Sequence, residues 1–403
     1  MTATAEYGTI RFRKHLVPQF PLGRHGRHSE GKAGVATDHN GVSDRPEVAA
    51  WNGFVDSLHK AGQQLAANTA ELSRTEQADA FRALLRSVNN QLGRLEVDRE
   101  RPELLPFNRW RQKFLMDNPD FLYWVADINA AVQYRIRGNR GGAAYVSITV
   151  YTAAGNGLES SAIARLDSDE IAFNELGDYD VTLGGNRPAD GDWIELPDGA
   201  ITLWVRHFHN DMHHDRAGWC DIEPVHAPQI PAPIDPERFC RQLTRAAKAA
   251  ALMPHIWKAA TAEDLEQVNQ LRHWHEMSGG ATYTEPGIHY LRGGWQLSPG
   301  EALLIEGELV DCRYWNILAY SRFLNSLDHR YRHVSYTGAT ATVTGQRYRF
   351  IVAGTDPGLA DADWIDTEQR PFGILVMRFL QPVQTPRLPS VRRILLTDLG
   401  RNP

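Results

Sequence analysis

The chain has 403 residues, which is long enough for two or three domains with a sizeable core. Its hydrophobic content of 42% and charged content of 23% are those of an ordinary soluble globular protein. With a net charge of -6 and no run of Lys and Arg, the sequence argues against nucleic acid as a partner, because neutralising phosphates requires a basic face.

The cysteine spacing and the N-terminus indicate where the protein works. Cys220, Cys240 and Cys312 are too far apart for a CxxC pair, and they form no disulfide framework. The first residues lack the apolar segment of a signal peptide, and no stretch of 18 apolar residues could span a membrane. We therefore expect a cytoplasmic protein with no membrane association.

The first half of the chain divides into an arm and a helical region. Residues 1–42 are rich in Gly, His and Arg with little periodicity, and they predict a flexible arm that could join copies into a homo-oligomer. Residues 43–128 predict helices, with apolar residues at helical spacing and a capping box at Ser73 and Glu76. The run 117–119, Asp-Asn-Pro, predicts the start of a shorter helix that contains residues 121–124.

The rest of the chain alternates between β-rich and linking segments. Residues 129–227 predict a first β-sandwich and residues 301–403 a second. Residues 228–300 predict a proline-rich and helical linker, with one helix over 239–252 and another from Thr261 to about Trp274.

The two β-rich segments resemble each other, which predicts an internal repeat. Without a gap, the segment from Tyr134 aligns with the segment from Leu303, and the spacing then holds over the whole unit. The period is too long, and the copies too few, for a solenoid. We therefore predict a mainly β protein of the α+β class, with tandem β-sandwich domains, an N-terminal helical layer and a helical linker. The aligned pairs are Ile136 with Ile305, Gly138 with Gly307, Tyr145 with Tyr314, Tyr151 with Tyr320, Trp193 with Trp364, and Arg206 with Arg378.

These residues carry a family resemblance. The strand Tyr145-Val-Ser-Ile-Thr-Val-Tyr151, then Asp192-Trp193-Ile-Glu-Leu-Pro197, Arg206-His-Phe208 and Trp219 resemble the pattern of the domain family of unknown function 1214, DUF1214. The second copy fits more loosely, through Trp315-Asn-Ile-Leu-Ala-Tyr320, Asp363-Trp364-Ile365 and Arg378, and it lacks the prolines after Trp364. The resemblance implies a jelly-roll-like β-sandwich and little about activity, because fold alone does not determine function.

The strand that ends near residue 208 contains an arginine that we expect to be buried. Leu203 and Val205 point to one face, while Trp204, Arg206 and Phe208 point to the other, so both faces are largely apolar. A buried guanidinium needs a carboxylate or carbonyl partner.

The first candidate site follows on the same strand. His207, His209 and Asp211 alternate, so on an extended strand they would share a face at a Cα spacing of about 6.5–7 Å. Two imidazoles at that spacing could converge on a metal, or one could act in acid–base chemistry near neutral pH. The alternative is a polar strand end that runs into a solvated loop. Whether a metal is bound stays open.

The second candidate site is the charged loop Asp328-His329-Arg330, with Asn316 nearby in the aligned strand. Asp, His and Arg together could bind an anion or transfer a proton. The alternative is a surface salt-bridge cluster. A third histidine group, His273 and His275, is predicted to lie on a helix, where residues two apart do not face each other, so we expect no metal site there.

These features favour an enzyme that acts on a small organic or carbohydrate-like substrate by His, Asp and Arg acid–base chemistry in an aromatic-lined cleft. In this hypothesis His207 or His209 performs the acid–base chemistry, and Arg206 or Arg330 holds an anionic or oxygenated group of the substrate. The alternatives are a non-catalytic protein that binds a sugar or lipid-like ligand, and an oligomeric scaffold. The sequence holds no P-loop and no Rossmann glycine motif with the right flanks, so a cofactor is left open.

Overall fold

The computed structural model describes residues 45–95, 99–108, 112–153, 160–226, 233–274 and 284–399. The predicted arm, 1–42, and most of the proline-rich stretch after residue 227 lie outside the described residues. No helix in the described ranges is long and apolar enough to cross a membrane.

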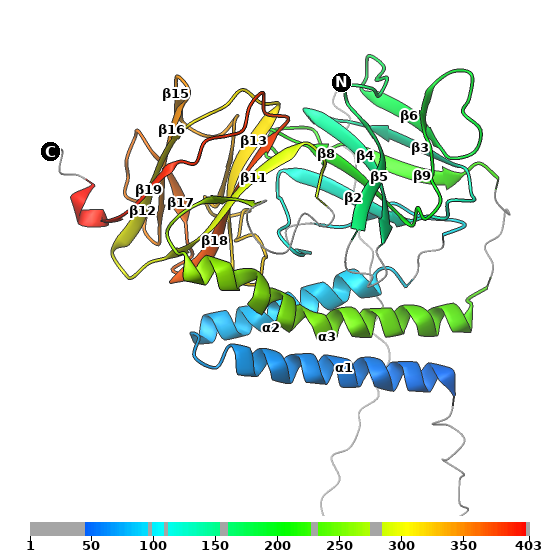
Figure 1. The fold of residues 1–403 in the computed structure, drawn as a ribbon, viewed down its shortest axis with the longest axis horizontal. Helices are drawn as coiled ribbons and strands as arrows, with labels where there is room; N and C mark the ends of the chain where they lie inside the picture. Colours follow the sequence, from blue (N-terminus) through cyan, green and yellow to red (C-terminus); the bar gives the residue numbers. More distant parts are fainter. Residues whose placement is uncertain are drawn as a thin grey trace, which may run out of the picture. The chain divides into compact units, whose positions relative to one another are not determined.

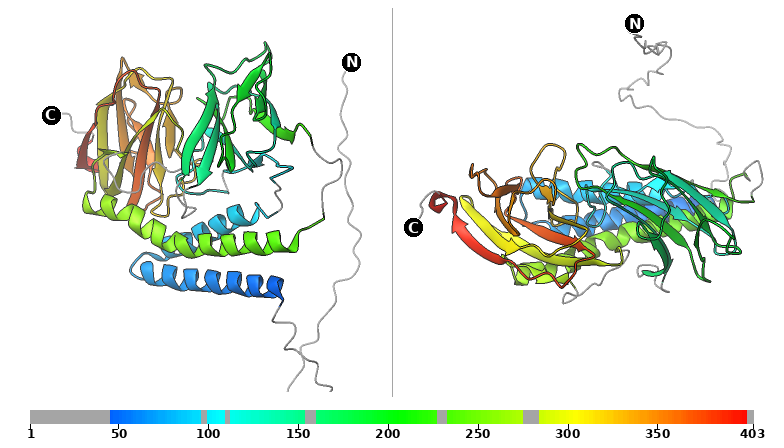
Figure 2. Two further views of the ribbon diagram at one scale, coloured as in Figure 1. Left: turned by 45° about the vertical axis from the view of Figure 1, so that its right-hand side comes forward. Right: turned by 90° about the horizontal axis from the view of Figure 1, so that it is seen from above.

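Three helices pack against one another beside the β-sheets (Figure 1; Figure 2). The predicted capping box is confirmed, because the Ser73 side chain accepts from the Glu76 backbone N–H and the Glu76 side chain accepts from Ser73. Small and apolar side chains such as Phe54, Leu243 and Ala247 fill the space between the helices. The helices are α1 (Pro46–Asn68), α2 (Arg74–Leu92) and α3 (Pro236–Glu266).

The linker contains one long helix rather than the two that we predicted. Thr261 lies inside α3 and its hydroxyl donates to the Trp257 carbonyl at 2.9 Å, so it does not start a new helix. The two predicted segments are joined because α3 continues through Pro254 and the residues between them. After α3 the chain forms the short strand β10 (Arg272–His273), so the predicted helix to Trp274 is also wrong.

The predicted short helix after residue 117 is wrong as well, because Phe121–Asp127 forms strand β2. The Asn118 side chain accepts from the Asp120 backbone N–H at 3.1 Å and turns the chain into the strand. The aromatic residues of β2 are buried on both faces of a sheet, a setting that favours extended backbone over a helix.

The first β unit consists of two packed sheets. One has the order β1-β2-β8-β4-β5 and the other β7-β6-β3-β9. Their facing sides form an apolar core that includes Ile136, Ile148, Val181 and Val205. The strands are β1 (Leu105–Pro106), β3 (Tyr134–Asn139), β4 (Tyr145–Ala153), β5 (Ser160–Asp167), β6 (Asp178–Leu183), β7 (Asp192–Ile194), β8 (Thr202–Phe208) and β9 (Trp219–Pro224).

The second β unit also has two sheets, with the orders β10-β11-β18-β13-β14 and β15-β16-β12-β19, and β17 pairs with β16. Strand β11 comes from the segment that we predicted to be a linker. The core of this unit continues into the helices through Leu65 and Trp257. The strands are β11 (Ile288–Gln296), β12 (Glu301–Glu308), β13 (Tyr314–Tyr320), β14 (Ser335–Thr337), β15 (Val343–Thr344), β16 (Arg347–Ala353), β17 (Asp363–Asp366), β18 (Phe372–Leu380) and β19 (Ser390–Leu395), followed by a 3-10 turn, Leu396–Asp398.

The strand orders of the two units correspond. The order β2-β8-β4-β5 matches β11-β18-β13-β14, and β7-β6-β3-β9 matches β17-β16-β12-β19. Both units also contain one parallel pair, β6 with β7 and β16 with β17. The mainly β, α+β fold with sandwich-like sheet pairs is confirmed, while the jelly-roll connection stays a prediction.

Candidate functional site

Arg206 is buried and paired, as the strand pattern predicts. It is 2% exposed, and its Nη1 donates to Glu285 Oε2 at 3.0 Å while Nη2 donates to the Tyr151 hydroxyl at 3.1 Å. Glu285 lies just before β11 of the second unit and also accepts from Ser147 and Arg165 of the first. This ion pair therefore joins the two β units. Our sequence reasoning missed Glu285, which belongs to no motif.

Asp120 is the counterpart of Glu285, with the two β units exchanged. It lies just before β2 of the first unit and contacts β13 of the second. Its Oδ2 accepts from the Tyr314 hydroxyl at 2.8 Å and from Asn316 Nδ2 at 2.9 Å. Burial raises the pKa of Asp120, and these hydrogen bonds oppose that effect. Asp120 is thus a buried carboxyl held chiefly by neutral donors, whereas Glu285 is held by two arginines.

Asp120 also lines a cleft of about 660 Å³ between the two β units. Both predicted clusters contribute to its wall: Asp211 from the first and His329 and Arg330 from the second. Thr337 links the walls by donating to the Asn210 carbonyl. The remaining lining residues are Pro119, Met212, His213, Arg332, His333, Ser335, Tyr336, Thr340 and Asp363.

The cleft combines proton-transfer groups with cations. Burial, with the positive charge of Lys113 nearby, lowers the pKa of His329 to about 3, so its imidazole is neutral at pH 7. Arg332 is already paired with Asp366 at 2.7 Å. The lining of the cleft also includes the Asp120 carboxyl and the Arg330 guanidinium.

Lys113 and Glu368 hold the loop that carries His329. Lys113 Nζ donates to the carbonyls of Ser326 and Leu327 at 2.7 and 2.6 Å. Burial lowers the pKa of Lys113 to about 8. Glu368 accepts from the Asp328 backbone N–H at 2.6 Å, so Asp328 serves the loop through its backbone and is not among the residues that line the cleft.

The histidines of the first cluster do not come together on one strand face. Strand β8 ends at Phe208, so the expectation that His207, His209 and Asp211 share an extended strand is wrong. The Asp211 side chain accepts from the backbone N–H groups of His213 and His214 and turns the chain there. His209 Nδ1 lies 3.3 Å from Asp215 Oδ2.

His207 lies in the core of the first unit rather than in the cleft. It is fully buried, and its Nε2 lies 2.9 Å from the Tyr179 hydroxyl. Burial lowers the pKa of His207 to about 3. An imidazole in this position stabilises the sandwich and has no path to a ligand in the cleft.

Across the described ranges, no group of three or more His, Cys, Asp or Glu side chains is arranged to hold a metal ion. His273 lies in strand β10, not on a helix, and its Nδ1 is 2.8 Å from His289 Nε2. The two imidazoles contact each other there.

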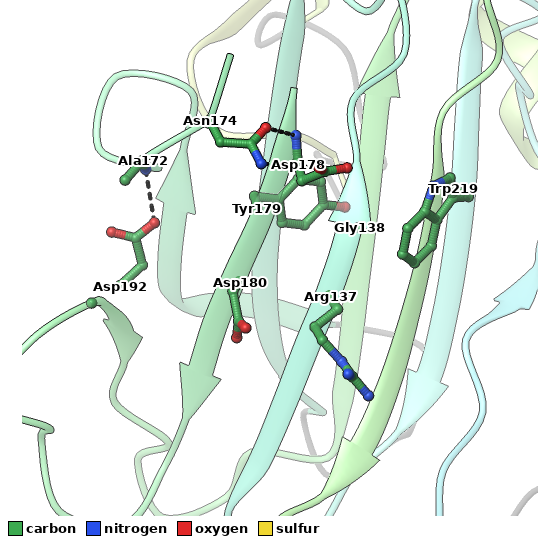
Figure 3. A pocket seen from close by; sticks show the side chains of 10 residues that line it. Arg137, Gly138, Ala172, Asn174, Asp178, Tyr179, Asp180, Asp192 and Trp219 are labelled. Carbon is green, nitrogen blue, oxygen red and sulfur yellow. Dashed lines mark hydrogen bonds between the residues drawn. The ribbon is translucent and has the colours of Figure 1, made fainter. Parts of the chain in front are cut away.

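A second, shallower hollow of about 490 Å³ lies on the outer face of the sheet that contains β3, β6 and β9 (Figure 3). Trp219, which is 53% exposed, stands at one side of it, with Arg137 and Asp180 on the neighbouring strands. The polar side chains are already engaged, because Arg137 pairs with Glu223 and Asp180 with Arg135.

The first β unit has a counterpart among known families. Residues 126–211 match the family described as "Protein of unknown function (DUF1214)". The resemblance to DUF1214 is confirmed there. This DUF1214 segment includes Arg206 and Asp211 but neither Asp120 nor the loop of His329.

A solved structure shares the architecture of this chain. An uncharacterised protein from Burkholderia cenocepacia is 26% identical, with a TM-score of 0.80 over 86% of this chain and 97% of that chain. A protein from Vibrio parahaemolyticus is 12% identical, with a TM-score of 0.45 over 85% of this chain and 99% of that chain. No curated protein matches the chain. The Burkholderia structure extends the likeness beyond the DUF1214 segment to the fold of most of the chain.

Proposed function

We propose that the protein is an enzyme that acts on a small organic molecule in the cleft between the two β units, with Asp120 as its proton-transfer group. The supporting observation is the setting of Asp120. It is a buried carboxyl with a raised pKa, it is fixed through one oxygen, and it lines the cleft. A carboxyl that has a raised pKa and lies in a cleft is the usual arrangement for a general acid or base.

The other cleft residues take complementary roles in this proposal. His329 is neutral at pH 7 and can accept or donate a proton, and Arg330 can hold an anionic or oxygenated group of the substrate. Asp211 shapes the opposite wall. In this proposal the roles of Arg206, His207, His209 and Asp328 are structural, because these residues are not among those that line the cleft.

The correspondence between the two units supports one further part of the proposal. We propose that the chain holds two copies of a β unit and that they have diverged in purpose. The carboxylate that contacts the first copy, Glu285, is closed into a double ion pair. The carboxylate that contacts the second copy, Asp120, is open to the cleft.

A two-stage experiment tests the enzyme. Small metabolites would first be screened for those that raise the melting temperature of the full chain, and the bound ones would then be followed by mass spectrometry for chemical change. We expect Asp120→Asn to keep binding but to lose conversion by about 100-fold or more, as for the loss of a general acid or base.

Asp363→Asn is the matched control, because Asp363 also lines the cleft but accepts from the backbone and hydroxyl of Thr342. It should keep conversion. Conversion that survives in the Asp120 variant would remove Asp120 from the mechanism, and ligands that bind without any change in the wild type would contradict the enzyme itself.

The outer hollow favours a second candidate, non-catalytic sugar binding. An exposed indole beside polar side chains is a surface on which a sugar ring can stack. If the hollow is the site, Trp219→Ala should abolish oligosaccharide binding, whereas Asp120→Asn should not affect it.

The cytoplasmic location stays a prediction, and the oligomer-forming arm lies outside the described residues.

A further inference from the structure

Arg378, on β18, is a buried arginine that forms no salt bridge within the described part of the chain. It is 4% exposed, and its Nη2 donates to the Tyr320 hydroxyl at 2.6 Å and to the Met116 carbonyl at 3.2 Å. Within the described residues, its Nη1 has no hydrogen-bond partner and no carboxylate pairs with it. Burying an unpaired guanidinium costs several kcal/mol, so a counter-ion from outside the described chain would be bound favourably.

The matching arginine of the first unit shows what this position accepts. Arg206 has the same contact between Nη2 and a tyrosine hydroxyl, here that of Tyr151, and its Nη1 is occupied by the Glu285 carboxylate at 3.0 Å. The strand registers agree, since Ser147 pairs with Arg206 and Asn316 pairs with Arg378. At Arg378 the place of that carboxylate is not taken by any described residue.

A second unpartnered polar atom lies beside it. Asn316 is fully buried, and its Nδ2 donates to Asp120, but among the described residues its Oδ1 has no partner. Asn316 pairs with Arg378 on one side and with Thr337 on the other. Neighbouring strands are about 4.8 Å apart, and Thr337 lines the cleft. Asn316 and Arg378 do not themselves line the cleft; they continue the row inward from Thr337, so a ligand in the cleft reaches them only by extending past Asp120.

We propose that the cleft ligand is a short carboxylate bearing a hydroxyl or amino group, with its carboxylate on Arg378 Nη1 and its donor group on Asn316 Oδ1. This assignment rests on the proposed function, because it places the acid group of the substrate beyond Asp120. A carboxylate on a guanidinium forms a charge-assisted hydrogen bond, and the buried site excludes the water that would weaken it. The donor on the ligand satisfies Asn316 Oδ1, which has no partner among the described residues.

Calorimetry on the full chain at constant ionic strength tests the assignment, with glycolate, acetate and neutral glycolamide as probes. We expect glycolate to bind more tightly than acetate, and glycolamide not to bind. Arg378→Met should weaken glycolate binding by about 10-fold or more, as for the loss of a hydrogen bond to a charged group. Glycolamide that binds as well as glycolate, or binding unchanged in the variant, would overturn the proposal.

A second variant covers the case in which Arg378→Met does not fold. Asn316→Asp supplies a carboxylate beside Arg378 from within the chain, and it should abolish glycolate binding in a folded protein. If a water molecule bonds Arg378 Nη1 and Asn316 Oδ1 instead, none of the probes will bind the wild type, and the carboxylate site is refuted.

The outcome separates this proposal from the proposed function. Asp120→Asn should still bind glycolate, since the proposed contacts of the ligand are with Arg378 and Asn316 and not with Asp120. Conversion of a neutral metabolite without glycolate binding would refute only the carboxylate site. Glycolate binding without conversion of any bound carboxylate would refute only the acid–base function.

Discussion

At the scale of single residues, burial decides what each titratable group does. His207 and His209 are only two residues apart, yet His207 is buried in the sandwich core and His209 contacts Asp215. Asp120, which belongs to no motif, is a buried carboxyl that lines the cleft. The type of residue was visible in the sequence, but its solvent access was not.

His207 leads to a prediction about pH. Burial lowers the pKa of His207 to about 3, below its unfolded value of about 6.5. Below pH 6.5 the unfolded chain therefore binds a proton that the folded chain does not, so the stability from neutral His207 is complete above that pH and is lost as the pH falls toward 3. Between pH 7.5 and 5.0 this loss is about 2 kcal/mol.

Urea unfolding of His207→Phe at the two pH values checks this. The variant loses the hydrogen bond to Tyr179 at both pH values, but its stability should fall by about 2 kcal/mol less than that of the wild type between them. His59→Phe is the control, because it removes an exposed imidazole on α1 instead of a buried one. An equal pH dependence in wild type and His207→Phe would show that His207 titrates normally.

At the scale of elements, the two carboxylates that precede β2 and β11 connect the sheets. Glu285 stabilises the first unit through Arg206 and Arg165, although it lies beside the strand that belongs to the second. The sequence patterns placed both strands poorly, since β2 was predicted as helix and β11 as linker. For this reason the contacts of Asp120 and Glu285 could not be predicted from the sequence.

Removing one charge of this connection should be costly. Glu285→Gln leaves Arg206 buried without its counter-ion, and we expect a loss of about 3–5 kcal/mol in the free energy of unfolding. The matched control is Glu223→Gln, which breaks the exposed pair with Arg137 and should cost about 1 kcal/mol or less. Similar losses for the two variants in urea unfolding would contradict a structural role for the buried pair.

At the scale of the whole molecule, the correspondence between the β units extends to single glycines. A Cβ on Gly138 would lie 2.3 Å from the Tyr179 ring, and a Cβ on Gly307 would lie 2.3 Å from the Tyr348 hydroxyl. Both positions therefore require the absence of a side chain, one in each unit. At Gly138 the backbone oxygen of Trp219 is also only 2.7 Å away.

This difference predicts the order of two substitutions. Gly138→Ala and Gly307→Ala should each destabilise the chain by about 1–3 kcal/mol through overpacking, with the larger effect at Gly138, where backbone would have to move. Gly53→Ala is the control, because nothing lies within 4 Å in α1 and alanine favours a helix. Thermal unfolding gives the order, and a neutral Gly138→Ala would refute the packing argument.

The sequence alone was sufficient for the β-rich class, the capping box of α2, the buried Arg206 and the DUF1214 likeness. These features depend on neighbours in the chain or on one strand's alternation, so a local pattern contains them. The repeat was also read from spacing, and it stays a prediction supported by the matching strand orders.

Only the tertiary structure decided which polar groups meet. Asp120 and its partner Asn316 are 196 residues apart, and Lys113 lies 213 residues before the carbonyl of Ser326 that it contacts. No local pattern encodes such contacts, because they arise when two separately formed sheets pack face to face. That packing brings the cleft together, and it also explains why Glu285 is closed by arginines while Asp120 remains open to a ligand.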